Sequence, residues 1–152
     1  YQQQHLAIAR ETKDRYAEEV ALNNLGLAYY ALGKYRTAIE YLQLSLTIAR
    51  ELQDRLTEGR AIGNLGLAYQ ALSDFHRAIH YQQQHLALAQ TIKEPQGKGQ
   101  ALGNLGLAYY ALGDYGRAIE YHEQHLIIAR EIKDRPGEGQ ALGNLGLAYQ
   151  AL

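Results

Sequence analysis

The sequence predicts an all-α protein built as a solenoid, in which antiparallel helix pairs stack one after another. Two observations predict this fold class. The chain repeats itself every 40 residues without an insertion, and apolar residues within a repeat recur at the spacing of three and four that marks one face of a helix. Repeats of about 20–50 residues are typical of solenoids, whose units bury apolar surface only against their neighbours.

Three sequence anchors recur in the same order. NLGLAY comes first, a stretch such as GDYGRAIEY follows it, and a stretch such as HLIIAR closes the unit. Because the anchors keep one spacing along the whole chain, every repeat is expected to have the same structure. The first anchor begins at Asn24, Asn64, Asn104 and Asn144.

The first half of each repeat is predicted to form a helix that we call the first-type helix. In the stretch 101–112, Leu102, Leu105 and Tyr109 lie on one stripe. Leu107 and Ala108 carry apolar character beyond that stripe, so this helix should be enclosed on more than one side. A glycine and a polar residue then supply a helix stop and a tight turn, as at Gly113.

The second half of each repeat is predicted to form a more amphipathic helix, the second-type helix. Ala118, Ile119 and Ala129 share one side of it, whereas Arg117 and Glu120 look outward. The helix ends are rich in charge. Three Glu and Arg pairs lie four residues apart, an order that stabilises a continuous helix: Glu11/Arg15, Glu51/Arg55 and Glu131/Arg135.

The repeat pattern predicts the boundaries of about eight helices in a single solenoid segment. Pro95 and Pro136 mark helix starts, because proline fits a first helical turn. The segments are a second-type helix at 1–14, repeats at 15–54, 55–94 and 95–134, and a first-type helix at 135–152. We interpret the segment as a fragment of a longer array.

The two ends of the segment look complementary. Continuing the pattern past Leu152 by a stretch equivalent to residues 73–80 leads back into the sequence that starts at Tyr1. A head-to-tail contact that does not close generates filaments. The alternative hypothesis for function is therefore a structural array that self-associates head to tail.

Composition excludes several classes of protein. The chain has 15 Lys and Arg against 16 Asp and Glu, so no basic excess favours nucleic acid. It has no cysteine, which excludes disulfides, thiol catalysis and Cys-based metal sites. No apolar run approaches the roughly 18 residues of a membrane span, and no signal peptide is recognisable, so a cytoplasmic location without membrane contact is expected.

No motif for catalysis or for a cofactor stands out. His76/His80 and His122/His125 share helix faces, but neither pair has a third ligand at a dependable spacing, and metal sites need three or four. No serine, histidine and carboxylate set recurs in a nucleophile arrangement. We therefore predict a protein that is not an enzyme and binds neither metal nor cofactor.

The repeat resembles the tetratricopeptide repeat. The order NLG-x-AYYALGDY-x-RAIEY carries the resemblance, with the small and aromatic signature positions at Leu105, Gly106, Tyr109 and Ala118 and their copies. It covers the whole chain. The 40-residue unit is most similar to the long-helix subfamily of the Leu-Gly-Asn repeat and partner-of-inscuteable adaptors, and to bacterial scaffold proteins. Two positions of the second-type helix depart from the common tetratricopeptide pattern. An aromatic or large apolar residue is usual at the first, which holds Gln2, Leu42, Gln82 and His122; a small residue is usual at the second, which holds His5, Ser45, His85 and His125.

The resemblance implies a right-handed superhelix whose first-type helices line a concave groove for a partner peptide. Carried over position by position, it predicts a surface of amides, glycines and leucines. It contains no row of cations. The predicted groove residues are Arg60, Gln100 and Gln140; Asn23, Gly63, Gly103 and Gly143; Asn24, Asn64, Asn104 and Asn144; Leu27, Leu67, Leu107 and Leu147; and Tyr30, Gln70, Tyr110 and Gln150.

The main functional hypothesis is a scaffold that binds a protein or peptide in this groove. Asparagine amides both donate and accept, which suits a grip on a partner's main chain; the alternative is that they only tie neighbouring first-type helices together. Glycines four apart, as at Gly99 and Gly103, allow close approach either of another helix in the array or of a bound peptide. Binding of a chaperone's carboxylate tail is not expected, because Gly103 and Leu107 stand where that activity requires Lys and Asn.

Overall fold

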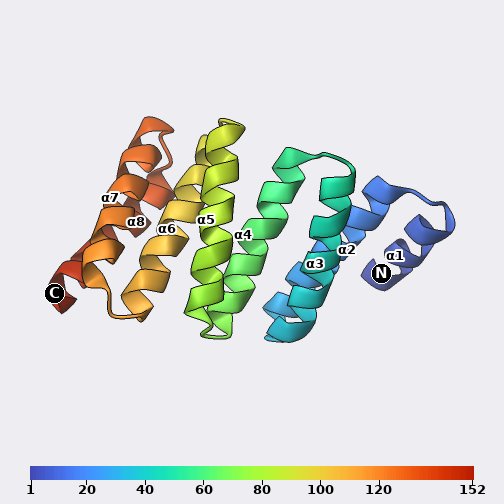
Figure 1. Cartoon of the computed structure of the whole chain (residues 1–152), viewed down its shortest axis with the longest axis horizontal. Coiled ribbons are helices and arrows are strands. Elements are labelled where there is room, and N and C mark those ends of the chain that lie inside the picture. The colour runs from blue at the N-terminus through green and yellow to red at the C-terminus, as the bar shows by residue number, and fades with distance from the viewer. The chain divides into compact units, whose positions relative to one another are not determined.

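The computed structural model describes all 152 residues and contains only helices and the turns between them (Figure 1). The predicted all-α class and the eight helices packed as sequential antiparallel pairs are confirmed. Every helix except the first spans 17 residues. The helices are α1 (Gln2–Glu11), α2 (Arg15–Ala31), α3 (Tyr35–Glu51), α4 (Arg55–Ala71), α5 (Phe75–Thr91), α6 (Pro95–Ala111), α7 (Tyr115–Glu131) and α8 (Arg135–Ala151).

The chain divides into two compact units, which we describe separately. Unit 1 covers Tyr1–Ser73 and holds α1 to α4; unit 2 covers Asp74–Leu152 and holds α5 to α8. In each unit the even-numbered helices are of the first type and the odd-numbered helices are of the second type.

The helix boundaries follow from local sequence. Most helices begin after an acidic N-cap whose carboxylate accepts a backbone N–H, as Asp54 does from Thr57. Pro95 starts α6 and Pro136 lies in the first turn of α8, as predicted. Each helix pair reverses through a residue with positive φ. At the two predicted glycine stops, Gly33 and Gly113, φ is 72° and 79°.

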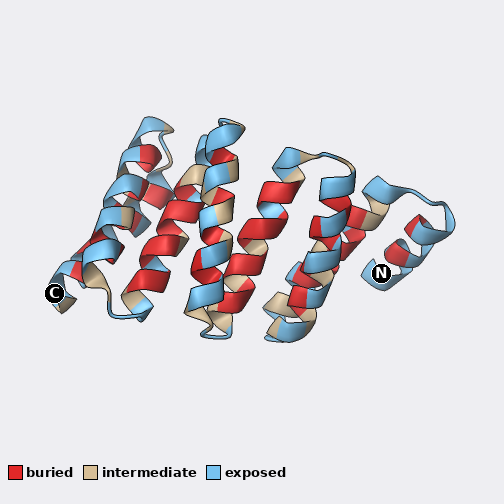
Figure 2. Cartoon of the chain, viewed as in Figure 1, coloured by how far each residue is buried: buried red, intermediate tan, exposed pale blue.

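Each unit has its own apolar core. In unit 1, Leu6 of α1 packs with Leu22 and Leu25 of α2 and Ile48 of α3. In unit 2, Ile79 of α5 and Ile119 of α7 pack with Leu105 and Tyr109 of α6, and Leu145 of α8 joins them. Buried residues run along most of α6, whereas α7 is exposed on its outer side (Figure 2). The prediction that first-type helices are enclosed on more than one side is thus confirmed for α6.

First-type helices lie next to one another within each unit. α2 contacts α4 and α6 contacts α8, whereas no Cα atoms of α1 and α3, or of α5 and α7, approach within 8 Å. The second-type helices are therefore splayed apart while the first-type helices converge. The concave side of each unit is consequently the side of its first-type helices.

Candidate functional site

The asparagines on the first-type helices behave differently in the two units. In unit 1, the Asn64 Nδ2 donates to Asn23 Oδ1 over 3.3 Å, which links α4 to α2. In unit 2, Gly103 stands at the position equivalent to Asn23, so Asn144 has no such partner. Neither Asn104 nor Asn144 makes a side-chain hydrogen bond, although both are half-buried. Unit 2 thus presents free amides on the face where unit 1 uses one to join its helices.

Leucines on the same helices leave apolar surface open to solvent. Leu27 is 41% exposed, Leu107 37% and Leu147 55%, while Leu67 is half-buried. One turn further, the ring of Tyr30 lies 5.3 Å from that of Tyr35, and the ring of Tyr110 lies at the same distance from Tyr115. These two tyrosines are therefore held by the start of the following helix.

The remaining predicted groove residues fall into three groups by burial. Arg60, Gln100, Gln140, Gly143 and Gln150 are exposed, and Asn23, Asn24 and Gln70 are half-buried. Gly63 and Gly103 are buried. A Cβ atom on Gly103 would lie 3.0 Å from the Nδ1 of His125 in α7, so Gly103 faces the packing between helices. It lies outside the surface that a ligand could reach.

Glycines of α6 make room for histidines of α7. His122 is buried with its ring over Gly106, where a Cβ atom would meet ring atoms 2.5 to 2.7 Å away. His125 lies over Gly103, and Ile128 touches the space beside Gly99. The contacts of these glycines are with side chains of the neighbouring helix, so the glycines allow close packing of α6 against α7. The Nδ1 atoms of both histidines are buried without a hydrogen-bond partner.

Burial keeps these histidines neutral. It lowers the pKa of His122 to about 4, and the neighbouring His125 adds to the effect. Burial also lowers the pKa of His125, although the carboxylate of Asp134 acts in the opposite direction. His85 of α5 follows the same pattern, because burial lowers its pKa against the opposing effect of Glu94. No group of three or more histidines and carboxylates is arranged to hold a metal ion.

Charged residues cluster at the joints, by which we mean the turns from a second-type helix to the next first-type helix. At the α3–α4 joint, Glu58 accepts from Arg50 Nε over 2.9 Å and from Arg55 Nη1 over 2.8 Å. Burial raises the pKa of Glu58, but the two arginines outweigh it and the net pKa is lowered. The same Arg–Glu–Arg triad forms around Glu18 and around Glu138.

The prediction that Glu and Arg four residues apart stabilise one continuous helix is wrong. The turn 12–14 separates Glu11 from Arg15, so the two residues do not share a helix. Arg15 instead pairs with Glu18 in its own first turn, and also with Glu51 at the end of α3. The arginine at the start of a first-type helix therefore pairs with a glutamate in the first turn of that same helix.

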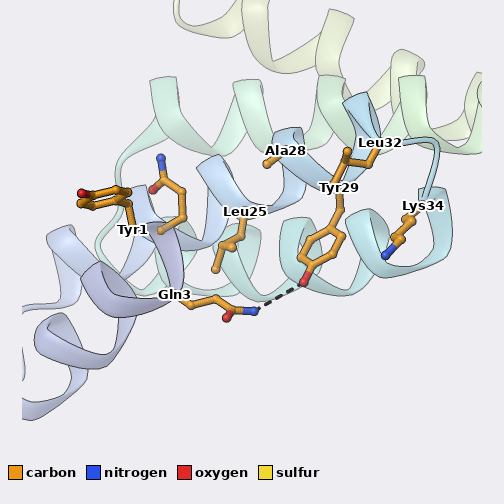
Figure 3. A pocket seen from close by; sticks show the side chains of 8 residues that line it. Tyr1, Gln3, Leu25, Ala28, Tyr29, Leu32 and Lys34 are labelled. Carbon is orange, nitrogen blue, oxygen red and sulfur yellow. Dashed lines mark hydrogen bonds between the residues drawn. The ribbon is translucent and has the colours of Figure 1, made fainter.

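A pocket of about 350 Å³ opens between α1 and α2 (Figure 3). Leu25, Tyr29 and Leu32 form one wall, and Gln3 donates to the Tyr29 hydroxyl over 3.5 Å. In unit 2, Ile79 in the first half of α5 packs against the equivalent surface of α6.

The pattern of paired helices prompts comparison with known families. The family model described as Tetratricopeptide repeat matches residues 1–51, 18–91 and 97–152. The chain belongs to the tetratricopeptide repeat family. No curated protein matches it by sequence. No helix of this tetratricopeptide repeat (TPR) protein combines the length and the apolar character that a membrane crossing requires.

Three solved structures illustrate the similarity. BtubC (BKLC) from P. vanneervenii is 26% identical with a TM-score of 0.81, over 91% of this chain and 57% of that protein. A putative kinesin light chain TPR-like protein from Podosopora anserina is 23% identical with a TM-score of 0.79, over 99% and 75%. The first TPR of Spaghetti (RPAP3), bound to the HSP90 peptide SRMEEVD, is 22% identical with a TM-score of 0.70, over 88% and 91%. This chain thus spans little more than half the length of BtubC.

Sequence reasoning missed two features of the TPR units. It did not pair His122 and His125 with the glycines that receive them, because the residues concerned are sixteen to twenty-two positions apart in the chain. It also missed the Arg–Glu–Arg triads and the one joint that lacks them. That joint carries Gln90, Pro95 and Lys98, so aligning the repeats would have revealed it.

Proposed function

We propose that this chain is a non-enzymatic scaffold that holds a partner peptide on the concave side of its first-type helices. One observation carries the proposal. In unit 2, the half-buried amides of Asn104 and Asn144 have no hydrogen-bond partner and lie on helices that also expose Leu107 and Leu147. An amide can pair with both the N–H and the C=O of an extended main chain, while leucines take up apolar side chains.

The composition of this face restricts the ligand. The face has no lysine at the position of Gly103 and no asparagine at that of Leu107, so a carboxylate tail would find no clamp. The HSP90 peptide bound by the RPAP3 domain is consequently a poor model for the partner of this chain. We infer a neutral, partly apolar segment, because the face offers amides and leucines and no row of cations.

Peptides selected from a random display library against the whole chain test the proposal. Asn104→Ala with Asn144→Ala should weaken capture at least about tenfold, or ~1.4 kcal/mol, without changing helical content by circular dichroism. The matched control is Glu120→Ala with Gln124→Ala, which alters exposed residues of α7. Unchanged affinity in the asparagine variant, or equal loss in the control, would refute groove binding.

A second function, head-to-tail self-association, is favoured by a pair of complementary faces. On α7, residues His122, His125 and Ile128 pack over the glycines of α6. The equivalent residues of α1 are Gln2, His5 and Ile8, and all are exposed. The equivalent glycines of α8 have open space at the Cβ position: Gly139, Gly143 and Gly146.

We infer that α1 of one copy can lie on α8 of another as α7 lies on α6. Sedimentation velocity over a range of concentrations tests this idea. Gly143→Leu should abolish association, because a leucine would occupy the space that His5 needs. A wild-type chain that stays monomeric at high concentration rules out the stacked array.

A further inference from the structure

Two buried histidines of α7 pack against α6, one of the two helices that carry the proposed groove of unit 2. Only 1% of His122 and 7% of His125 is exposed. The His122 ring lies where a side chain of residue 106 would be, and the Nδ1 atom of His125 lies 3.0 Å from the place of a Cβ atom at Gly103. These two rings therefore set how closely α7 approaches α6.

The groove residues of α6 directly follow the glycines that receive the rings. Asn104 comes after Gly103, and Leu107 comes after Gly106. Successive residues of a helix point about 100° apart, so one stretch of α6 carries the histidine contacts and the proposed groove on two neighbouring sides. A movement of α6 relative to α7 consequently moves the groove residues as well.

The helix α7 also holds the second groove helix. It packs against both α6 and α8, and its Ile119 shares one apolar cluster with Leu105 of α6 and Leu145 of α8. Asn104 and Asn144 lie on these two helices, so the relative placement of their amides depends on α7 staying packed. Separation of α7 from α6 would disrupt the surface that a peptide contacts.

The surroundings of the pair offer little to a positively charged ring. The Nδ1 atoms of His122 and His125 are buried without a hydrogen-bond partner. On the α6 side the rings meet glycines, and the one charged residue of that helix, Lys98, is itself a cation. The tyrosines of α6 and α8 stay neutral at acid pH. A proton on either ring would therefore be unfavourable while the helices stay packed.

Carboxylates at the start of α8 do not compensate for this cost. Asp134 favours the charged form of His125, but burial has the larger effect and the pKa of His125 is lowered. Asp134 also accepts the Gly137 N–H as the N-cap of α8. The carboxylate of Glu138 is already paired with two arginines of its own joint.

We propose that this histidine pair makes the peptide groove of unit 2 acid-sensitive: as the rings take up protons, α7 separates from α6 and the bound peptide is released. The inference rests on the proposed groove function and adds its regulation. Unit 1 has no counterpart, because Leu42 and Ser45 occupy the two positions in α3 and neither titrates.

The direction of the effect follows from burial. Burial lowers the pKa of His122 from 6.5 to about 4, so between these values the separated state takes up a proton that the packed state refuses. Within this window, each histidine raises the ratio of separated to packed molecules about tenfold for every unit by which the pH falls. The packed state is fully favoured above the window, and peptide affinity falls with the packed fraction.

Peptide affinity measured across the pH range tests the proposal. The probe is a peptide selected at about pH 7 from a display library that encodes no Asp, Glu or His, and synthesised with blocked ends so that it does not titrate. Affinity for the whole chain should be at least about tenfold weaker at about pH 4.5 than at about pH 7. Over the same range, amide hydrogen exchange should accelerate in α6 and α7 but not in α2 and α3.

Two double variants separate the buried pair from other histidines. His122→Leu with His125→Gln removes both titrating rings, so it should bind the peptide at neutral pH and lose less than about twofold in acid. His76→Gln with His80→Gln alters exposed histidines of α5 and should keep the loss shown by the wild type. Circular dichroism checks that both variants keep their helical content.

The possible failures are distinguishable. If no peptide is captured at neutral pH, the groove itself is refuted. If capture at neutral pH is followed by equal affinity in acid, or by an equal loss in the variant without His122 and His125, the acid release is overturned and the groove remains. Exchange that accelerates equally in α2 and α3 would also overturn it, because the whole chain would then be unfolding.

Discussion

The α2–α3 pair of unit 1 and the α6–α7 pair of unit 2 pack different side chains over equivalent glycines. In unit 1, Leu42 is fully buried against Gly26. In unit 2, His122 takes the place of Leu42, against the equivalent Gly106. The backbone is the same, but the space above one glycine is filled by an apolar chain and above the other by a neutral imidazole.

One helical turn further the difference involves charge. Ser45 donates its hydroxyl to the buried carboxylate of Glu19 over 2.6 Å. Unit 2 has His125 in place of Ser45 and Gly99 in place of Glu19, so the large imidazole ring faces a residue without a side chain. Large and small residues have been exchanged across the interface, as close packing demands. Each interface therefore needs its own set of partners.

The two sets of partners give opposite dependence on pH. Burial raises the pKa of Glu19, which means that its contribution is fully present at low pH and is lost as pH rises through the folded-state pKa. Burial lowers the pKa of His122 and His125, so their contribution is present above the unfolded-state pKa and is lost as pH falls. Acid should weaken unit 2 at this interface, whereas a rise in pH above the ordinary range of a glutamate should weaken unit 1.

The largest expected effect is acid destabilisation of the α6–α7 pair. Between the ordinary pKa of 6.5 and the folded-state value of about 4, His122 alone should cost about 3 kcal/mol, since the unfolded chain takes up a proton that the folded chain refuses. Hydrogen exchange of α7 amides measured across this pH range reports the loss. His122→Leu, which copies Leu42, should remove most of it. If α7 protection in wild type and variant falls in parallel, other groups cause the acid effect.

Substitution of glycine by alanine should change the stability of the chain in opposite directions at a packed position and at an open one. Gly106→Ala places a methyl group 2.5 to 2.7 Å from the His122 ring and should destabilise the chain by about 1–3 kcal/mol in urea unfolding. Gly146→Ala is the matched control at the equivalent position of α8, where no atom lies within 4 Å. It should stabilise by up to about 1 kcal/mol, because alanine is the better helix former. Equal effects at both sites would mean that the ring moves aside.

Loss of the hydroxyl at Ser45 should destabilise unit 1 more at high pH than at low pH. Ser45→Ala leaves the Glu19 carboxylate buried without its donor, at a cost of about 1–3 kcal/mol when the carboxylate is charged. Protonation of Glu19 at low pH should reduce this cost. Chemical denaturation at two pH values measures the difference, and a cost that does not change with pH would show that Glu19 keeps one protonation state over this range.

The smallest expected effect concerns the triads. Glu58→Gln removes the charge that Arg50 and Arg55 share and should cost no more than about 1 kcal/mol, because the arginines are largely exposed. Added salt should reduce the difference between wild type and variant. A cost that persists at high salt would point to packing of the side chain and not to its charge.

Sequence alone determined the architecture of this TPR chain. The 40-residue period, the helical spacing around Leu105 and the prolines at positions 95 and 136 were sufficient to predict the helices and their order. These features depend on local backbone preference and on which face of a helix is apolar, and both can be read from neighbouring residues.

Only the tertiary structure decided what the individual side chains do. Asn64 joins two helices while Asn144 stays free, because the difference lies in the residue at positions 23 and 103 on another helix. Arg15 binds Glu18 and Glu51 but not Glu11, because a turn with Lys13 at positive φ lies between Glu11 and Arg15. Such contacts join residues that are distant in the chain or divided by a turn, and they depend on how helices pack, which periodicity does not specify.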